Sequence, residues 1–117
     1  MIINSSQANT AVVEKPLGGV GQMDFQSYIG DDIKVAGSRF AMSAKITLPP
    51  GSTVGYHMHP TDEEIYFILE GTGSYVENDK SEHPVSPGSL TLCPKGEGHA
   101  LINNSQGPLV FLAFIAE

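Results

Sequence analysis

Cysteine, basic residues and long apolar runs are all scarce in this chain of 117 residues. Its one cysteine, Cys93, can form no internal disulfide, which favours a reducing compartment and a cytoplasmic location. Six basic residues stand against thirteen acidic ones, so the net charge of −7 would repel a phosphate backbone. No apolar run approaches the roughly 20 residues of a membrane-spanning helix, and the N-terminus lacks the basic start and apolar block of a secretory signal. We therefore expect neither a nucleic acid nor a membrane as a partner.

Turn-forming residues, by contrast, are abundant. Thirteen glycines and eight prolines divide the chain into short apolar or alternating runs, and no stretch of a dozen residues has a helical period. Many short strands separated by turns are typical of an all-β sandwich or barrel. We expect one domain over residues 1–117, with an irregular segment containing one or two edge strands over 1–35 and the barrel over 36–117. The expected strands span residues 40–48, 64–70, 74–77, 89–93, 99–103 and 108–116.

Two of these segments predict which side chains face inward. Every second residue from Phe40 to Leu48 is apolar, so that set should face a core. Residues 64–70 are apolar on both faces, with Tyr66 and Ile68 on the face of Glu64. A strand that is apolar on both faces is covered on both, and the second cover would be the N-terminal segment or a partner subunit. The residues on this second face are Ile65, Phe67 and Leu69.

His57, His59 and Glu64 form the clearest chemical motif. The two histidines are two residues apart, so on an extended segment both imidazoles point to one side. A short turn after His59 lets Glu64 fold back beside them. Imidazole nitrogen and carboxylate oxygen together suit Mn, Fe, Co, Ni or Zn. His99, which follows a loop rich in proline and glycine, is the candidate for a fourth ligand.

Each of these residues also has a plainer interpretation. A His-x-His pair by itself can be part of a polar surface strand. Glu63 is a rival carboxylate, but on a strand it would point away from Glu64, toward solvent or an interface. His83 precedes Pro84 in a polar segment and is expected on a surface turn. Cys93 is expected to be a small apolar strand residue.

The spacing of these residues resembles, in full, the two motifs of the cupin superfamily between Gly51 and Asn103. The first motif has the form G-x5-H-x-H-x4-E-x6-G, and the second the form G-x5-P-x-G-x2-H-x3-N. The residues that match the first are Gly51, His57, His59, Glu64 and Gly71. The residues that match the second are Gly88, Pro94, Gly96, His99 and Asn103.

This resemblance implies a small antiparallel jelly-roll barrel, the double-stranded β-helix, with a metal ion inside one end. It implies that His57, His59, Glu64 and His99 hold one divalent ion per chain, with Mn or Fe favoured over Ni, Zn or Co. Four ligands on an octahedral ion would leave two neighbouring positions open for a small chelating molecule. The resemblance also implies a homodimer.

Strand parity predicts that Phe40, Met42, Tyr66 and Ile68 line the ligand pocket, although Phe40 and Ile68 could equally be barrel core. Tyr66 is the one candidate for a catalytic group, because its hydroxyl can donate or accept a hydrogen bond. Arg39 falls on the outer parity of its strand, so an anionic ligand would be held mainly by the metal.

Two classes of function follow from this. The first is a metal-dependent enzyme, such as a dioxygenase, decarboxylase, isomerase or lyase, acting on a small polar, metal-chelating metabolite. The second is a non-catalytic module that binds a sugar or an organic acid. The fold does not choose between them. A purely structural metal is a poor third alternative, because the coordination sphere would remain open.

Overall fold

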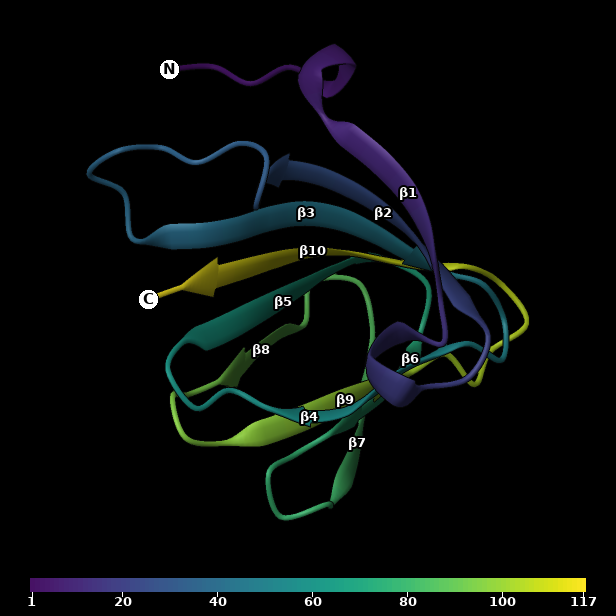
Figure 1. Ribbon diagram of the computed structural model, residues 1–117. Helices are drawn as coiled ribbons and strands as arrows, with labels where there is room; N and C mark the ends of the chain where they lie inside the picture. Colours follow the sequence, from purple (N-terminus) through teal and green to yellow (C-terminus); the bar gives the residue numbers. More distant parts are fainter.

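Two antiparallel β-sheets pack face to face in the computed structural model, which describes residues 1–117 (Figure 1). The larger sheet has the strand order β1-β2-β3-β10-β5-β8 and the smaller one β4-β9-β6-β7. None of the helical segments has the length and apolar character that crossing a membrane requires. The predicted all-β antiparallel barrel is confirmed. The strands are β1 (Asn9–Glu14), β2 (Gln22–Ile29), β3 (Phe40–Leu48), β4 (Thr53–Met58), β5 (Glu63–Glu70), β6 (Gly73–Val76), β7 (Glu82–Val85), β8 (Leu90–Cys93), β9 (Gly98–Ile102) and β10 (Leu109–Ala116).

The six strands expected from the sequence all form, each within one residue at either end. The expected turn around His83 is wrong, because this residue lies on β7. Pro84 is tolerated there since β7 is the edge strand of its sheet. The N-terminal segment contains an edge strand, β1, within the expected one or two, but it also supplies the inner strand β2, which lies between β1 and β3.

The core lies between the two sheets, where the inward faces of the strands meet. Phe111 and Ile68 enter it from the larger sheet and Leu101 from the smaller one, and all three are fully buried. Replacing Phe111 with alanine would cost about 3–5 kcal/mol, the usual range for a large core side chain.

A β-bulge in β4 turns a histidine toward this interior. Val54 pairs with Leu101 of β9, but the next pair is His57 with His99, so β4 carries one extra residue. The bulge reverses the alternation, and both Val54 and His57 therefore face inward. Gly55 lies within it, and a Cβ at this position would overlap the backbone of the turn at Pro16–Gly18. Only glycine fits at this close approach.

A second bulge corrects the expectation for Phe40. Ile115 of β10 pairs with Met42, and Ala116 then pairs with Phe40, which leaves Ala41 as the extra residue of β3. The side chain of Phe40 is therefore turned away from the face of Met42, and the residue is 51% exposed. Phe40 does not line the pocket, because the alternation seen in the sequence is broken at this point.

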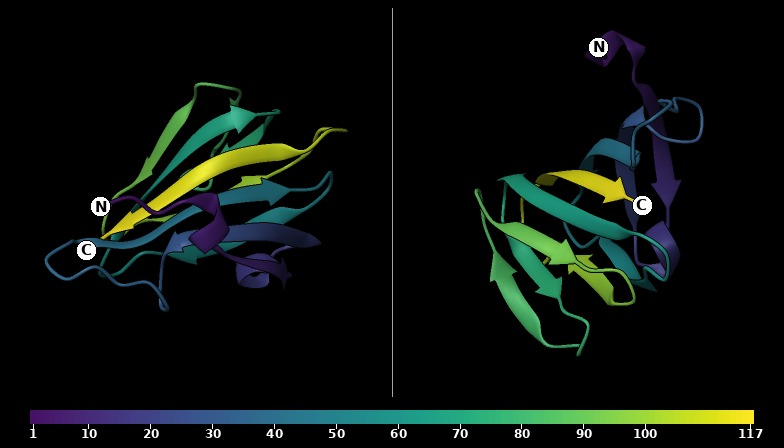
Figure 2. Two further views of the ribbon diagram at one scale, coloured as in Figure 1. Left: turned by 90° about the horizontal axis from the view of Figure 1, so that it is seen from above. Right: turned by 90° about the vertical axis from the view of Figure 1, so that its left-hand side faces the viewer.

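The outer face of β5 is only partly covered within one chain. Ile65 and Phe67 are half-buried, and Leu69 is exposed. The N-terminal segment cannot be the second cover, because β1 and β2 extend the same sheet at its other end (Figure 2). Leu90 and Leu92 of the neighbouring β8 are exposed beside Phe67 and Ile65, so the apolar face continues across two strands.

Candidate metal centre

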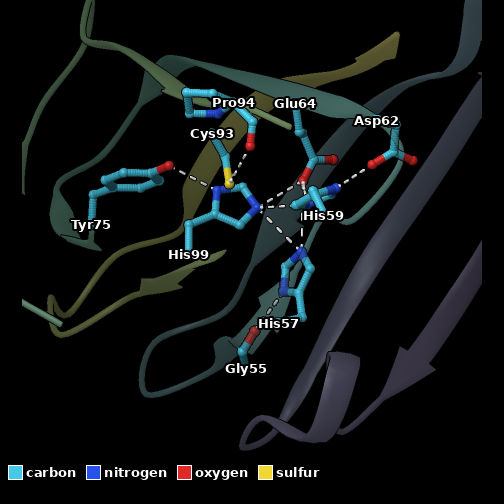
Figure 3. A network of polar contacts seen from close by, with 9 residues as sticks. All are labelled: Gly55, His57, His59, Asp62, Glu64, Tyr75, Cys93, Pro94 and His99. Atoms are coloured by element: carbon cyan, nitrogen blue, oxygen red, sulfur yellow. Dashed lines mark hydrogen bonds and ion pairs between the residues drawn. The ribbon is translucent and has the colours of Figure 1, made fainter. Parts of the chain in front are cut away.

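Three histidines and one glutamate converge at one end of the barrel (Figure 3). His57 lies on β4, His59 in the loop that follows, Glu64 on β5 and His99 on β9. Their nitrogen and oxygen donor atoms all lie within 4.8 Å of one another. His59, Glu64 and His99 are buried, and His57 is partly buried. The structure therefore brings together all four side chains that the sequence predicted as ligands.

His99 lies at the centre of the cluster. Its Nε2 is 3.0 Å from Oε1 of Glu64, 3.1 Å from Nε2 of His59 and 3.2 Å from Nε2 of His57. Oε1 of Glu64 lies 3.3 Å from Nε2 of His59 and 3.8 Å from Nε2 of His57. Four donor atoms thus surround a single small volume.

The opposite nitrogen of each imidazole already has a hydrogen-bond partner. Nδ1 of His57 donates to the carbonyl oxygen of Gly55 at 2.7 Å. Nδ1 of His59 donates to Oδ1 of Asp62, also at 2.7 Å. Because each neutral ring carries one proton, Nε2 of both residues presents a lone pair to the centre.

The ring of His99 is also held by a hydrogen bond, since its Nδ1 is 2.8 Å from the hydroxyl of Tyr75. The sequence did not single out Asp62 or Tyr75 for these positions. Asp62 carried a signal, because it stands in the short loop between two expected ligands. Tyr75 carried none, because it is 24 residues from its partner.

This donor set fits a divalent cation. Nitrogen lone pairs that face one another at 3.1–3.2 Å repel unless a positive charge lies between them. Ligand atoms about 2.0–2.2 Å from an ion, at right angles to one another, are about 3 Å apart. Hydrogen-bonded imidazoles and a carboxylate are also the pattern of partners that orients metal ligands in proteins. The cluster could therefore hold a metal ion.

The pKa shifts of the cluster residues also favour a positive charge beside Glu64. Burial by itself would raise the pKa of the Glu64 carboxyl. Hydrogen bonds from the three surrounding imidazoles lower the pKa by more than burial raises it, so the group is ionised. The hydrogen bond with Glu64 raises the pKa of His59 despite its burial. Burial lowers the pKa of His99 and favours its neutral, metal-binding form.

A cavity of about 300 Å³ opens beside the cluster, between β4 and the inner face of the larger sheet. Met42 and Tyr66 lie in its wall. Ile68 does not, because it is fully buried in the core. Strand parity predicts the face of β5 on which Ile68 lies, but it does not predict how far this side chain is buried below the cavity wall. Met23 and Phe25 also line the cavity, although their segment was expected to be irregular; the alternation of residues 22–26 was the available signal.

Tyr66 connects the cavity to the cluster. Its ring stacks on the imidazole of His99, with centroids 4.9 Å apart and planes 18° apart. Burial and the charge of Glu64 raise the pKa of the Tyr66 hydroxyl well above its ordinary value. The hydroxyl is therefore a hydrogen-bond donor at neutral pH and not a base.

The rival residues lie elsewhere. Glu63 is exposed, while the adjacent Glu64 is buried. His83 is exposed on β7, where its Nε2 is 3.1 Å from Oγ of Ser81. Cys93 pairs with Glu64 across β8 and β5 and is buried, and burial raises the pKa of its thiol to about 11. The thiol is not one of the converging donors.

Comparison with known proteins places the chain among similar structures. Residues 44–115 match the family model described as "Cupin domain". The "Oxalate-binding protein" of Thermotoga maritima is 32% identical over 115 residues, which are 98% of this chain and 93% of that protein. A crystal structure described as a predicted oxalate decarboxylase, also from Thermotoga maritima, superposes with a TM-score of 0.88 at 30% identity, covering 99% of this chain and 98% of the other. The polyketide cyclase RemF of Streptomyces resistomycificus shares the fold, with a TM-score of 0.77 at 20% identity over 99% of this chain and 78% of its own.

Proposed function

Because the chain belongs to the cupin family, we propose that it binds one divalent metal ion through His57, His59, Glu64 and His99. We propose further that the bound ion captures a small chelating metabolite, on which the protein acts as an enzyme. The proposal rests on one observation above all. The four donor atoms converge, while the Nδ1 atoms of His57, His59 and His99 are already engaged.

The chain's own residues would prepare the site for such a ligand. Asp62 and Tyr75 hold two imidazoles with Nε2 toward the centre. Tyr66 offers a protonated hydroxyl from the cavity wall. When bound, the metal would supply Lewis acidity and open positions for two ligand atoms.

The ligand is proposed to be a small molecule that chelates through two oxygen atoms. The name of the Thermotoga maritima relative supports this, since oxalate is such a molecule. Among the metals that this donor set accepts, Mn and Fe are proposed ahead of Ni, Zn and Co. A cytoplasmic location is part of the proposal, and the lone, buried Cys93 supports it.

A non-catalytic binding protein is the second candidate. The cavity favours it in one respect, because Asp62 and Tyr66 are its only titratable side chains apart from the donor cluster. Asp62 is engaged with His59, and Tyr66 is protonated at neutral pH. No free base therefore stands ready for proton abstraction, so chemistry would depend on the metal.

Elemental analysis of untagged protein, purified without chelators, tests the proposal. We expect about one metal ion per chain, and calorimetric binding of oxalate that disappears after treatment with EDTA. Turnover of any chelating substrate by the loaded protein would favour the enzyme, and tight binding without turnover would favour the second candidate. A protein that contains no metal, and takes up none of Mn, Fe, Co, Ni or Zn, would contradict both.

We also propose that the protein forms a homodimer through the outer face of β5 and β8. An apolar face spread over two strands is typical of an interface, and a two-fold pair would cover it on both copies. Light scattering should give twice the chain mass of 12.4 kDa. Leu92→Asp should shift the protein to monomer, while Val20→Asp, also at an exposed apolar residue, should not. A monomeric wild-type protein would contradict the proposal.

A further inference from the structure

The wall of the cavity is apolar everywhere except at the metal centre. Beyond His57, His59 and Glu64, Asp62 and Tyr66 are the only lining side chains that can form a hydrogen bond without involving sulfur, and no lysine or arginine is present. The larger sheet contributes most of the remaining wall. That apolar part includes Met23, Phe25, Met42, Ile46 and Ile115.

With a divalent ion bound, the charge of the metal centre would be neutralised by a ligand that carries one negative charge. A divalent ion together with the Glu64 carboxylate carries one net positive charge. The cavity is also lined by a second carboxylate, Asp62, which is paired with His59 and would repel further negative charge. A second anionic group on the ligand would therefore face methionine and isoleucine side chains without a partner, which is unfavourable.

The size of the cavity exceeds that of the smallest chelators. At roughly 30 Å³ of liquid volume per water molecule, a cavity of about 300 Å³ has room for about ten waters. Oxalate has six non-hydrogen atoms and is polar at both ends, so it would occupy the donor end and leave the apolar end without a ligand.

The mouth of the cavity is apolar as well. Leu17 lines it with 59% of its surface exposed, and Met58 lines it with 53% exposed. Leu17 adopts a left-handed backbone conformation with φ of 49°, which is unfavourable for a leucine. Two large apolar side chains thus remain at the opening, where an apolar ligand would cover them.

We infer that this site takes a monoanionic, bidentate chelator with an apolar body, such as a 2-oxo acid carrying a branched aliphatic or aromatic group. Its 2-oxo acid head lies at the metal, and its apolar body packs against the wall around Met42, Ile46 and Ile115. This inference rests on the proposed function, because the metal must be present to hold the head.

A series of ligands with a constant head and a growing tail tests the inference. The protein is loaded with Co²⁺, the stoichiometry is checked by elemental analysis, and calorimetry then measures the affinity for pyruvate, 2-oxobutanoate, 4-methyl-2-oxopentanoate and phenylpyruvate. Burial of each methylene group should tighten binding about four-fold. We therefore expect a gain of at least about ten-fold from pyruvate to 4-methyl-2-oxopentanoate.

Two variants locate the tail. Met42→Gln should reduce this gain several-fold, because an amide would then face the apolar tail. Ile115→Thr, at the same wall, provides a second variant should Met42→Gln fold poorly. Val20→Gln, at an exposed residue outside the cavity, should leave the whole series unchanged.

The possible failures are distinct. Absence of Co²⁺ from the protein, or failure of the loaded protein to bind either oxalate or any 2-oxo acid, would overturn the proposed function itself. Binding of oxalate without binding of any 2-oxo acid would leave the proposed function intact and overturn the inference. If pyruvate binds but the affinity stays constant or falls along the series as the tail grows, the proposed function stands. The inference that the ligand has an apolar body would then be overturned. If the affinity gain along the series is the same in Met42→Gln, Ile115→Thr and the wild type, the apolar body does not lie in this cavity.

Discussion

Two regions of the molecule contain the same kinds of side chain but differ in burial and in hydrogen-bond partners. The first is the donor cluster around His99 on β9. The second is a surface depression around His83, on the edge strand β7, which also contains Glu77, Asp79 and Glu97. Histidine and carboxylates are present in both. His99 is fully buried, whereas His83 is exposed.

The difference lies in what the donor atoms have to interact with. In the surface depression, Asp79 accepts hydrogen bonds from the backbone and hydroxyl of Ser81, and Nε2 of His83 contacts the same hydroxyl. These groups are satisfied within their own hairpin and by solvent. In the buried cluster, the four inward donor atoms converge on one small volume, and the hydroxyl of Tyr66 also hydrogen-bonds to Glu64. A candidate metal site thus comes from buried donor atoms that converge, and composition alone does not make one.

The largest expected effect separates the two histidines directly. His99→Ala should weaken metal binding by more than about 100-fold, since even residues that only orient metal ligands contribute about 10- to 100-fold. His83→Ala should bind metal as the wild type does. Metal titrations of both variants measure the contrast, and equal affinities would show that the buried cluster is not the site.

A smaller effect is expected where the side chain acts through a ligand. Asp62→Ala removes the acceptor for Nδ1 of His59 and should weaken metal binding by about 10- to 100-fold. Asp79→Ala, in the surface depression, is the matched control and should leave the affinity unchanged. If both variants bind as tightly as the wild type, Asp62 does not position His59.

The pH dependence of stability should also differ between neighbouring glutamates. Because the folded pKa of Glu64 lies below its ordinary value of 4.5, its contribution to stability is full above that pH and is lost as the pH falls toward the folded pKa. Metal-free Glu64→Gln should therefore lose less stability than the wild type between about pH 6 and pH 4, by on the order of 1 kcal/mol.

Urea unfolding in EDTA at both pH values provides the measurement. Glu63→Gln is the control, because Glu63 is exposed, and it should lose as much stability as the wild type. A steeper loss in Glu64→Gln than in the wild type would mean that the carboxylate of Glu64 is not stabilised by the imidazoles.

The smallest effect on metal binding is expected at Cys93, which pairs with Glu64 but is not a member of the cluster. Burial raises the pKa of its thiol to about 11, so the thiol is protonated at neutral pH and is a poor ligand. Cys93→Ala should keep the metal stoichiometry and hold the affinity within about two-fold of the wild type. Loss of the metal in this variant would add sulfur to the donor set.

Much of the fold followed from local patterns. The alternation from Phe40 to Leu48 and the turns rich in glycine and proline placed six strands within one residue of their ends. The spacing of His57, His59, Glu64 and His99 was enough to predict which residues gather. The pocket was harder to predict, because Phe40 lies beyond a bulge and Ile68 lies too deep.

Sequence by itself thus determined the class of fold and the exclusion of Glu63, because alternation along a strand and short turns are local properties, and its resemblance to the cupin motifs implied which donors converge. Only the tertiary structure decided that a bulge turns His57 inward, that Asp62 and Tyr75 orient two of the rings, and that the cavity is apolar. Those features depend on strand register and on contacts between segments far apart in the chain, and such contacts leave no periodic trace in the sequence.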